Sequence, residues 1–222
     1  MKYPGFSCKT LFFQKIAVEP RWFAKQVTNT KHFINEKLKN APERTGVAIT
    51  TLAELISAKE ILTAVVTELE KDGYSKRGSL IQPTHYSPSL PSNLERVATT
   101  MRVTLNRRPL LPPSRSELIA EPGGTTVLQY LVNTGEAVLL DDKTVLSVSA
   151  YRKARKKVVE FLLREQKATT STLRHILGTN RRIIVPLLEN LDHRGVTLRI
   201  GNERTLSAQS RSTNSTSEKF GS

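Results

Sequence analysis

The chain of 222 residues is 38% hydrophobic, which is enough for modest cores in one to three small domains. Its formal net charge of +14, with a pI near 10.1, favours a polyanionic partner. Cys8 is the single cysteine, so the sequence excludes an intramolecular disulfide framework and a Cys-rich zinc site. There is no run of about 18 apolar residues, and the N-terminus lacks the apolar core of a signal peptide. We therefore expect a cytoplasmic protein that does not enter a membrane.

The positive charge is concentrated toward the C-terminus. Residues 149–207 carry 13 lysines and arginines against 5 acidic residues, whereas residues 82–148 carry 6 of each. Charge placed for solubility alone would be spread more evenly along the chain. Residues 149–207 are therefore the first candidate for a nucleic-acid-binding region.

The first half of the chain predicts one module after an unassigned segment. Residues 1–30 contain apolar side chains without a lasting period, and we assign them no structure. Residues 31–88 form the first module. Its signals are a helical face at residues 33–38, a capping-box pattern at Thr51–Glu54, a helix from about Ala58 to Asp72 that stops at Gly73, and a short strand within residues 80–86.

The second module, residues 89–148, repeats this order. A helix is predicted from residue 91 or 92 to Asn106, and Ser114–Glu117 is a capping box that opens a short helix. A further helix from about Gly124 to Asn133 stops at Gly135. Residues 137–140 and 144–148, with a turn between them, read as a hairpin.

The third module, residues 149–207, has the clearest pattern. A helix is predicted from Tyr151 to about Gln166, followed by a short helix that ends at Gly178. Thr179 or Asn180 can cap the next helix, which runs to Gly195. Val196–Ile200 and Arg204–Leu206 then alternate around a Gly-Asn turn, as in a hairpin. Residues 208–222 are rich in Ser and Thr, and we predict a disordered tail.

The same apolar triad precedes the glycine that follows the last helix of each module. The triads are Val65, Val66 and Leu69; Val127, Leu128 and Leu131; and Leu187, Leu188 and Leu191. Gly73, Gly135 and Gly195 are spaced 62 and 60 residues apart, which suits one helix–helix–helix–hairpin domain per repeat. The repeat predicts a mainly α chain with small β-hairpins (α+β), arranged as tandem winged-helix domains. In the alternative, unrelated helices end in glycine by chance, since glycine is the usual C-terminal stop.

The sequence carries no signature of an enzyme. It has no G-x-x-x-x-G-K-[S/T] phosphate loop and no G-x-G-x-x-G turn after a strand. The histidines lack cysteine partners and i, i+4 spacing, and no nucleophile has a neighbouring base. We expect a binding module with no catalytic residue, metal or cofactor.

The sharpest local signal is the predicted helix start after Gly178. A helix N-terminus presents free N–H groups to phosphate, and the side chains there are polar or cationic. The candidates for RNA contact are Arg174, Thr179, Asn180, Arg181 and Arg182, with Arg199 and Arg204 on the hairpin as supporting phosphate contacts. In the plainer interpretation, the two arginines of the first turn belong to a solvated helix face.

Residues 151–206 resemble the last winged helix of the bacterial selenocysteine-specific translation elongation factor family, SelB. The resemblance is closest in LRHILGTNRR (173–182), PLLENLD (186–192) and GVTLRIGNER (195–204). The family carries an FRDLLGTSRK-like run, a PLLEYFD-like helix and a G-x-T-x-R-x-G-x-x-R hairpin. Here Arg182 replaces the usual Lys, Asn180 the usual Ser and His175 the usual Asp. The PPSRSEL run of the second module resembles the preceding winged helix of the family, and residues 31–88 resemble the family more weakly.

The resemblance implies a role in translation. In that family the last winged helix binds the selenocysteine-insertion (SECIS) hairpin of an mRNA, which brings selenocysteinyl-tRNA and GTP to a recoded UGA codon. The GTPase and tRNA-binding domains are absent from this chain, which would correspond to the C-terminal part of such a factor. It would be a fragment, a truncated reading frame or one piece of a split protein. The implied partner is an mRNA hairpin bound by a monomer, with the ribosome and the tRNA reached only through the missing domains.

An RNA hairpin would be bound differently from DNA. The major groove of A-form RNA is too deep and narrow for a helix, so we expect contacts with phosphate and sugar and with a splayed loop or bulge base. The second module, whose charges balance, would then act as a spacer.

Two other functions fit the predicted fold. A winged-helix DNA-binding regulator would need a dimerisation element and a long polar recognition helix, whereas the helix here becomes apolar directly after Arg182. A winged-helix array that binds proteins would show little salt-dependent affinity for RNA.

Overall fold

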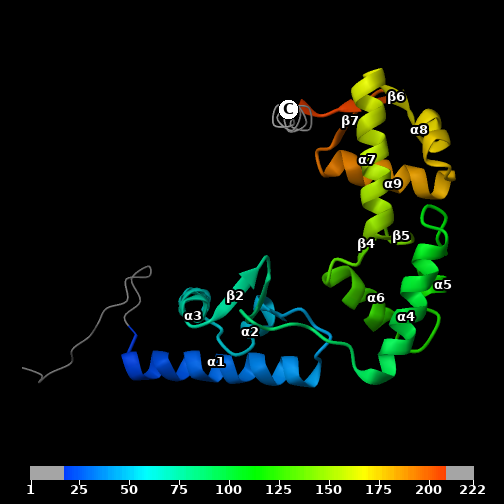
Figure 1. Cartoon of the computed structure of the whole chain (residues 1–222). Helices are drawn as coiled ribbons and strands as arrows, with labels where there is room; N and C mark the ends of the chain where they lie inside the picture. Colours follow the sequence, from blue (N-terminus) through cyan, green and yellow to red (C-terminus); the bar gives the residue numbers. More distant parts are fainter. Residues whose placement is uncertain (1–17, 209–222) are drawn as a thin grey trace, which may run out of the picture. The chain divides into compact units, whose positions relative to one another are not determined.

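The computed structural model describes residues 18–208, so the predicted tail after Ala208 and most of the unassigned N-terminal segment lie outside the described residues. The chain divides into two compact units, Met1–Pro91 and Ser92–Ser222. Helices alternate with small antiparallel sheets throughout, which confirms the predicted α+β winged-helix class (Figure 1). Within residues 18–208, no helix has the length and apolar character needed to cross a membrane.

The first unit packs three helices against a small sheet. Its elements are α1 (Pro20–Asn40), β1 (Val47–Ala48), α2 (Ile49–Leu52), α3 (Lys59–Lys71), β2 (Tyr74–Arg77) and β3 (Leu80–Pro83). The strands pair antiparallel in the order β1-β3-β2. Ile34, Leu52, Leu69 and Ile81 are fully buried in one core that joins the helices to the sheet.

The first helix begins at Pro20 rather than near residue 31. The Glu19 carboxylate accepts hydrogen bonds from the backbone N–H groups of Arg21 and Trp22, and Pro20 occupies the first turn, where its missing N–H costs nothing. The proline that interrupts the apolar pattern of the N-terminal segment is therefore a helix start. Residues 20–30 form part of the first helix.

One other prediction in this unit was wrong, and one strand was not predicted. Thr51 lies inside α2 instead of capping it, because β1 leads directly into the helix and the N–H of Ile49 donates to the carbonyl of Ser79 (2.9 Å). The strand β2 was not predicted, because only Tyr74 of its four residues is buried and the others are polar. Its position is set by pairing with β3, which local sequence does not reveal.

The second unit contains two modules in succession. The first consists of α4 (Ser92–Arg107), α5 (Arg115–Leu118), α6 (Gly124–Asn133), β4 (Ala137–Leu139) and β5 (Val145–Ser147). The predicted capping box at the start of α5 is confirmed, since the Ser114 hydroxyl accepts from the N–H of Glu117 and the Glu117 carboxylate accepts from the N–H of Ser114. The sheet has two strands rather than three. Pro112 and Pro113 precede α5 where a third strand would pair, and proline has no N–H to donate.

The last module has the complete arrangement. It consists of α7 (Val148–Glu165), β6 (Ala168–Thr169), α8 (Thr170–Leu177), α9 (Arg181–His193), β7 (Thr197–Ile200) and β8 (Glu203–Leu206). The strands pair in the order β6-β8-β7, and β7 and β8 form the wing. The helix α7 starts at Val148, three residues before the predicted Tyr151, because the Ser147 side chain caps it by accepting from the N–H of Ala150 (3.3 Å).

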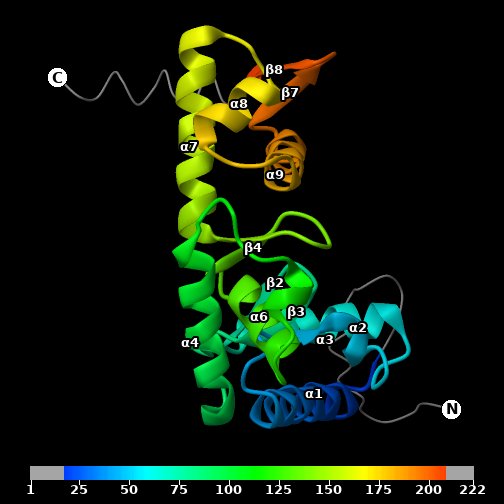
Figure 2. The ribbon, with the colours of Figure 1, turned by 90° about the vertical axis from the view of Figure 1, so that its right-hand side faces the viewer.

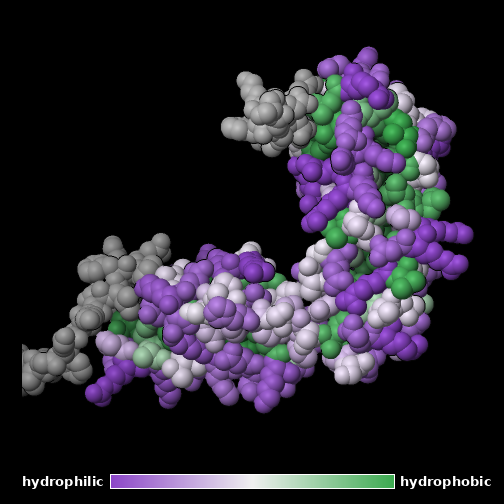
Figure 3. All heavy atoms as spheres, viewed as in Figure 1, coloured by the Kyte–Doolittle hydropathy of each residue, from purple (hydrophilic) through white to green (hydrophobic). Residues whose placement is uncertain are grey.

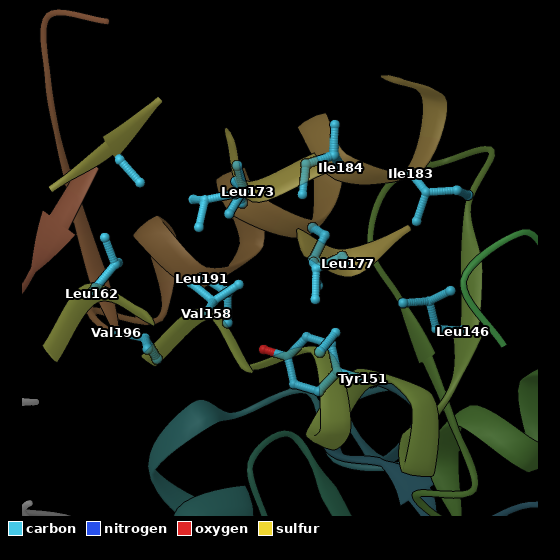
Figure 4. Close-up of a cluster of buried hydrophobic side chains, with 14 of the residues drawn as sticks. Leu146, Tyr151, Val158, Leu162, Leu173, Leu177, Ile183, Ile184, Leu191 and Val196 are labelled. Carbon is cyan, nitrogen blue, oxygen red and sulfur yellow. The ribbon is translucent and has the colours of Figure 1, made fainter. Parts of the chain in front are cut away.

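The three apolar triads lie in the buried faces of α3, α6 and α9. All nine side chains are buried, and the α9 triad is completely inaccessible to solvent. In the last module these leucines pack with residues of α7 and α8 in one cluster, which includes Leu146 from β5 (Figure 4). Because β5 runs into α7 without a linker, the two modules of the second unit share this core.

Candidate nucleic-acid interface

The start of α9 is fixed by a tight turn and a side-chain cap. Gly178 ends α8 with φ +60°, a left-handed conformation that glycine adopts without steric cost. Asn180 then caps α9, as predicted for Thr179 or Asn180, by accepting from the N–H of Ile183 (3.2 Å). The two features hold Arg181 and Arg182 at the first two positions of the helix.

We expect the Asn180→Ala substitution to destabilise the third module by about 1 kcal/mol, because one N–H of the first turn loses its acceptor. Urea unfolding followed by circular dichroism would measure the change in the free energy of unfolding. Asn180→Ser keeps a capping oxygen and serves as the control. A loss for serine equal to that for alanine would contradict the capping role.

Four of the predicted arginines line one groove of about 410 Å³ between α8, α9 and the wing. Arg174 comes from α8, Arg181 from α9, and Arg199 and Arg204 from the wing. The remaining lining residues are Thr170, Ser171, Ile184, Val185 and Glu189. The structure thus brings together cationic side chains that are up to 30 positions apart in the sequence.

Three of these arginines are accessible to a ligand. Arg181 and Arg199 are exposed and Arg174 is half-buried. The ion pairs found within residues 18–208 involve none of the three. Arg174 lies 3.3 Å from a ring nitrogen of His175, and Arg199 donates to the carbonyl of Gly201 (3.1 Å). Glu189 is the acidic side chain of the groove, which is therefore strongly but not uniformly cationic.

Arg204 occupies a different environment. Its side chain is 5% exposed, and its Nε donates to Asp192 of α9 (2.9 Å) while another guanidinium nitrogen donates to the Thr170 hydroxyl (2.9 Å). The other carboxylate oxygen of Asp192 accepts from the Thr197 hydroxyl (2.5 Å). This network, which we call the wing clamp (Arg204, Asp192, Thr197, Thr170), joins β8, α9, β7 and α8.

Thr179 and Arg182 face the second module rather than the groove. The Thr179 hydroxyl donates to the carbonyl of Leu110 (2.6 Å), and the Arg182 guanidinium donates to the carbonyl of Pro112. The charge of Arg182 also contributes to lowering the pKa of Glu117, although the main cause is the hydrogen bonds that Glu117 accepts from Ser114. These two predicted site residues therefore hold the junction between the modules.

The second module carries charges of both signs at its surface. On α4, Arg102 pairs with Glu136 (2.8 Å) and Glu95 (3.1 Å), which raises the pKa of Arg102 and lowers that of Glu136. A cavity of about 480 Å³ beside α5 is lined by Asp141 and Asp142 as well as by cationic side chains. The positive and negative side chains of this module, which balance in number, therefore also lie beside each other in the structure.

Sequence reasoning missed a second group of cations, on α7. Residues 152–157 read RKARKK, and Arg152, Lys153, Arg155, Lys156 and Lys157 are all exposed. The net charge of residues 149–207 includes this run, but the predicted RNA contacts lie only on residues 174–182 and on the hairpin.

Across residues 18–208, no group of three or more His, Cys, Asp or Glu side chains is placed to hold a metal ion.

Comparison with known proteins identifies related sequences and folds. Residues 160–206 match the family model described as elongation factor SelB, winged helix. The selenocysteine-specific elongation factor of Desulfomicrobium baculatum is 23% identical over 186 residues, which cover 78% of this chain and 29% of that protein. The crystal structure of the bacterial selenocysteine-specific elongation factor EF-Sec aligns with a TM-score of 0.54 at 22% identity, covering 88% of this chain and 31% of that one.

A further solved structure is described as the mRNA-binding domain of elongation factor SelB from E. coli in complex with SECIS RNA. It aligns with a TM-score of 0.42 at 16% identity, over 53% of this chain and 99% of that one. The chain spans less than a third of the length of the D. baculatum protein and of EF-Sec. These comparisons confirm the resemblance found in the sequence: the chain is similar to the C-terminal winged-helix region of the SelB family, and the signature is strongest in its last module.

Proposed function

We propose that this chain, which corresponds to the winged-helix region of a SelB-type factor, binds an RNA hairpin through the groove between α8, α9 and the wing. The observation that carries the proposal is the convergence of Arg174, Arg181 and Arg199 from three elements on one groove, without carboxylate partners at ion-pair distance in the described part of the chain. Guanidinium groups that have no carboxylate partner are suited to phosphate oxygens.

The helix dipole adds to this argument. Arg181 and Arg182 stand at the positive end of α9, and the first turn contains no acidic residue. Each cation there is disfavoured by up to about 1 kcal/mol, and an anion bound at the helix start would relieve the repulsion. The free N–H groups of the first turn and the Arg181 side chain would then act on the same phosphate.

The shape of α9 favours RNA over the major groove of DNA. Six of its 13 residues are buried, and only Arg181, Arg182, Glu189 and His193 are exposed. A helix that reads a major groove needs a polar face along its length. Here only the tip is presented, which suits contacts with the backbone and with an unstacked loop base.

The roles of the seven candidate residues then differ. We assign phosphate or loop-base contact to Arg174, Arg181 and Arg199, and capping of the helix start to Asn180. Arg204 positions the wing through Asp192, and Thr179 and Arg182 position the groove against the second module. No catalytic role is proposed for this chain.

A more specific proposal rests on the similarity to the SelB family. We propose that the hairpin is a selenocysteine-insertion element of an mRNA and that the binding serves recoding of UGA. The GTPase step and delivery of selenocysteinyl-tRNA would belong to other domains. The chain would then anchor the factor to the message.

Selection from a pool of RNA hairpins with one stem and randomised loops would test the proposal. The full chain should enrich a defined loop sequence and bind it more tightly than a linear RNA of the same composition or a DNA duplex, at several salt concentrations. Equal affinity for all three ligands, or no enrichment of any loop, would reject specific hairpin binding.

The Arg181→Ala variant should bind the selected hairpin about 1–2 kcal/mol more weakly, because one charge-assisted phosphate contact is lost. Filter binding at fixed salt would measure the effect. Arg96→Ala removes a positive charge that is also exposed but lies on α4 of the second module, and it should change the affinity by less than about twofold. An affinity unchanged by Arg181→Ala in a folded protein would remove this residue from the interface.

A further inference from the structure

The helix α7 presents a continuous cationic face to solvent. Arg152, Lys153, Lys156 and Lys157 are exposed, and we call them the α7 basic face. The opposite side of the helix buries Tyr151, Ala154, Val158 and Leu162 in the core of the module. In Figure 3 hydrophilic side chains cover the part of the surface where Figure 1 shows α7.

This face is separate from the groove. None of the residues that line the groove comes from α7. In Figure 2 α7 lies along one edge of the module, while α9 and the wing lie on its other side. A ligand held in the groove therefore leaves the α7 basic face open.

The charges on this face are poorly neutralised. Arg152 and Lys156, and likewise Lys153 and Lys157, are like-charged pairs at i, i+4 spacing, each of which destabilises a helix by a few tenths of a kcal/mol. Among residues 18–208, the one ion pair of these four side chains joins Lys156 to Glu160 at 3.7 Å, between exposed groups. The helix α4, which has the same place in the second module, instead pairs Arg102 with two glutamates.

The chemistry of the face favours nucleic acid over protein. Protein interfaces are enriched in buried aromatic anchors and depleted in lysine. The α7 basic face has three lysines and one arginine, and the exposed Leu163 lies beyond it, toward the end of the helix. Flexible ammonium groups without an apolar anchor suit the phosphates that border the wide, shallow minor groove of an RNA helix.

We propose that the α7 basic face binds the phosphate backbone of a second RNA helix, independently of sequence, while the groove holds the hairpin. The module then joins two RNA segments, one chosen by its loop and one by its charge and shape. Duplex binding by the α7 basic face goes beyond the proposed function, because it does not require the groove to bind RNA; only the joining of two RNA segments rests on the proposed function.

The test uses the full chain with Arg152, Lys153, Lys156 and Lys157 all changed to glutamine. The matched control changes four exposed cations of α1, namely Arg21, Lys25, Lys37 and Lys39, to glutamine, so both variants lose the same charge. The probe is a labelled blunt RNA duplex of about two helical turns, titrated at several salt concentrations with and without the selected hairpin. Circular dichroism verifies that both variants are folded.

We expect the α7 variant to bind the duplex at least about tenfold more weakly, with a salt slope of log K reduced by about 3, since each lost phosphate contact removes about 0.7–0.9. The control should keep its duplex affinity, and the wild-type chain should form a ternary complex with duplex and hairpin. Duplex binding by a chain that selects no hairpin loop would reject the proposed function and leave this inference standing.

Three results would overturn the inference. The α7 variant and the control could weaken duplex binding equally, which would assign the effect to overall charge. The hairpin could displace the duplex without a ternary complex, which would indicate one shared site. Polyglutamate at equal charge concentration could compete for the α7 basic face more strongly than duplex RNA, which would indicate an acidic protein as the partner.

Discussion

Replacing Arg174, Arg181 and Arg199 together by alanine should weaken hairpin binding by about 3–5 kcal/mol, a loss of more than about 100-fold. Each guanidinium lies at the same groove, and none of the three is at ion-pair distance from a carboxylate within residues 18–208. Because two of them are exposed and one is half-buried, the thermal stability should change little. The salt slope of log K should fall by about 2–3.

The matched control removes three exposed cations of α1, with Arg21, Lys25 and Lys39 changed to alanine. It should reduce affinity only by the small effect of net charge. The opposite change at the groove, Glu189→Gln, removes a carboxylate that repels phosphate and should strengthen binding by a few fold. A triple variant that binds no worse than the control, or a Glu189→Gln variant that binds less well, would place the RNA elsewhere on the chain.

The repeat was the part of the fold most open to prediction. The apolar triads before Gly73, Gly135 and Gly195 specify helices whose buried faces recur at a fixed offset, and burial follows from that periodicity alone. Likewise, the cap at Asn180 and the capping box at Ser114 are local interactions within four residues. Such features depend on neighbours in sequence, which is why the sequence predicts them at Ser114 and Asn180. The same kind of signal failed at Thr51, because the pairing of β1 with a distant strand moves the start of α2.

What could not be predicted depends on distant neighbours. The strand β2 exists because β3 pairs with it, and the junction exists because Thr179 and Arg182 meet carbonyls some 70 residues earlier in the chain. In the sequence, an arginine at a helix start indicates a ligand contact. The sequence does not reveal whether its partner is a phosphate or a carbonyl of the preceding module. The sequence therefore indicated which cationic residues lie near the start of α9 and on the wing, but not which of them line the groove and which are bonded to other parts of the protein.

The groove has a floor and a wall that are held in place by different contacts. Its floor is rigid, since α9 is capped, its triad is buried and its tip is held against residues 110–112. Its wall is the wing, whose strand β7 carries Arg199 and whose strand β8 pairs with the short strand β6. A ribbon of two strands is only marginally stable by itself, so the position of the wing also depends on contacts with the helices.

The wing clamp supplies that contact, and Arg204→Ala should destabilise the third module by about 2–4 kcal/mol. Removing Arg204 leaves the Asp192 carboxylate, which is 21% exposed, with the Thr197 hydroxyl as its remaining clamp partner, and leaves the Thr170 hydroxyl without its donor. Urea unfolding of the full chain would measure the free energy of unfolding. Arg199→Ala, on the neighbouring strand, should change it by less than about 0.5 kcal/mol.

Stability and binding together separate a positioning arginine from a contacting one. Arg204→Ala should lose both stability and hairpin affinity, whereas Arg199→Ala should lose affinity alone. Changing both members of the pair, Arg204→Met with Asp192→Leu, should restore much of the stability, because no buried charge is left unpaired. Its hairpin affinity should recover in parallel if the wing returns to its place. Recovered stability without recovered affinity would instead show that the Arg204 guanidinium itself touches the RNA.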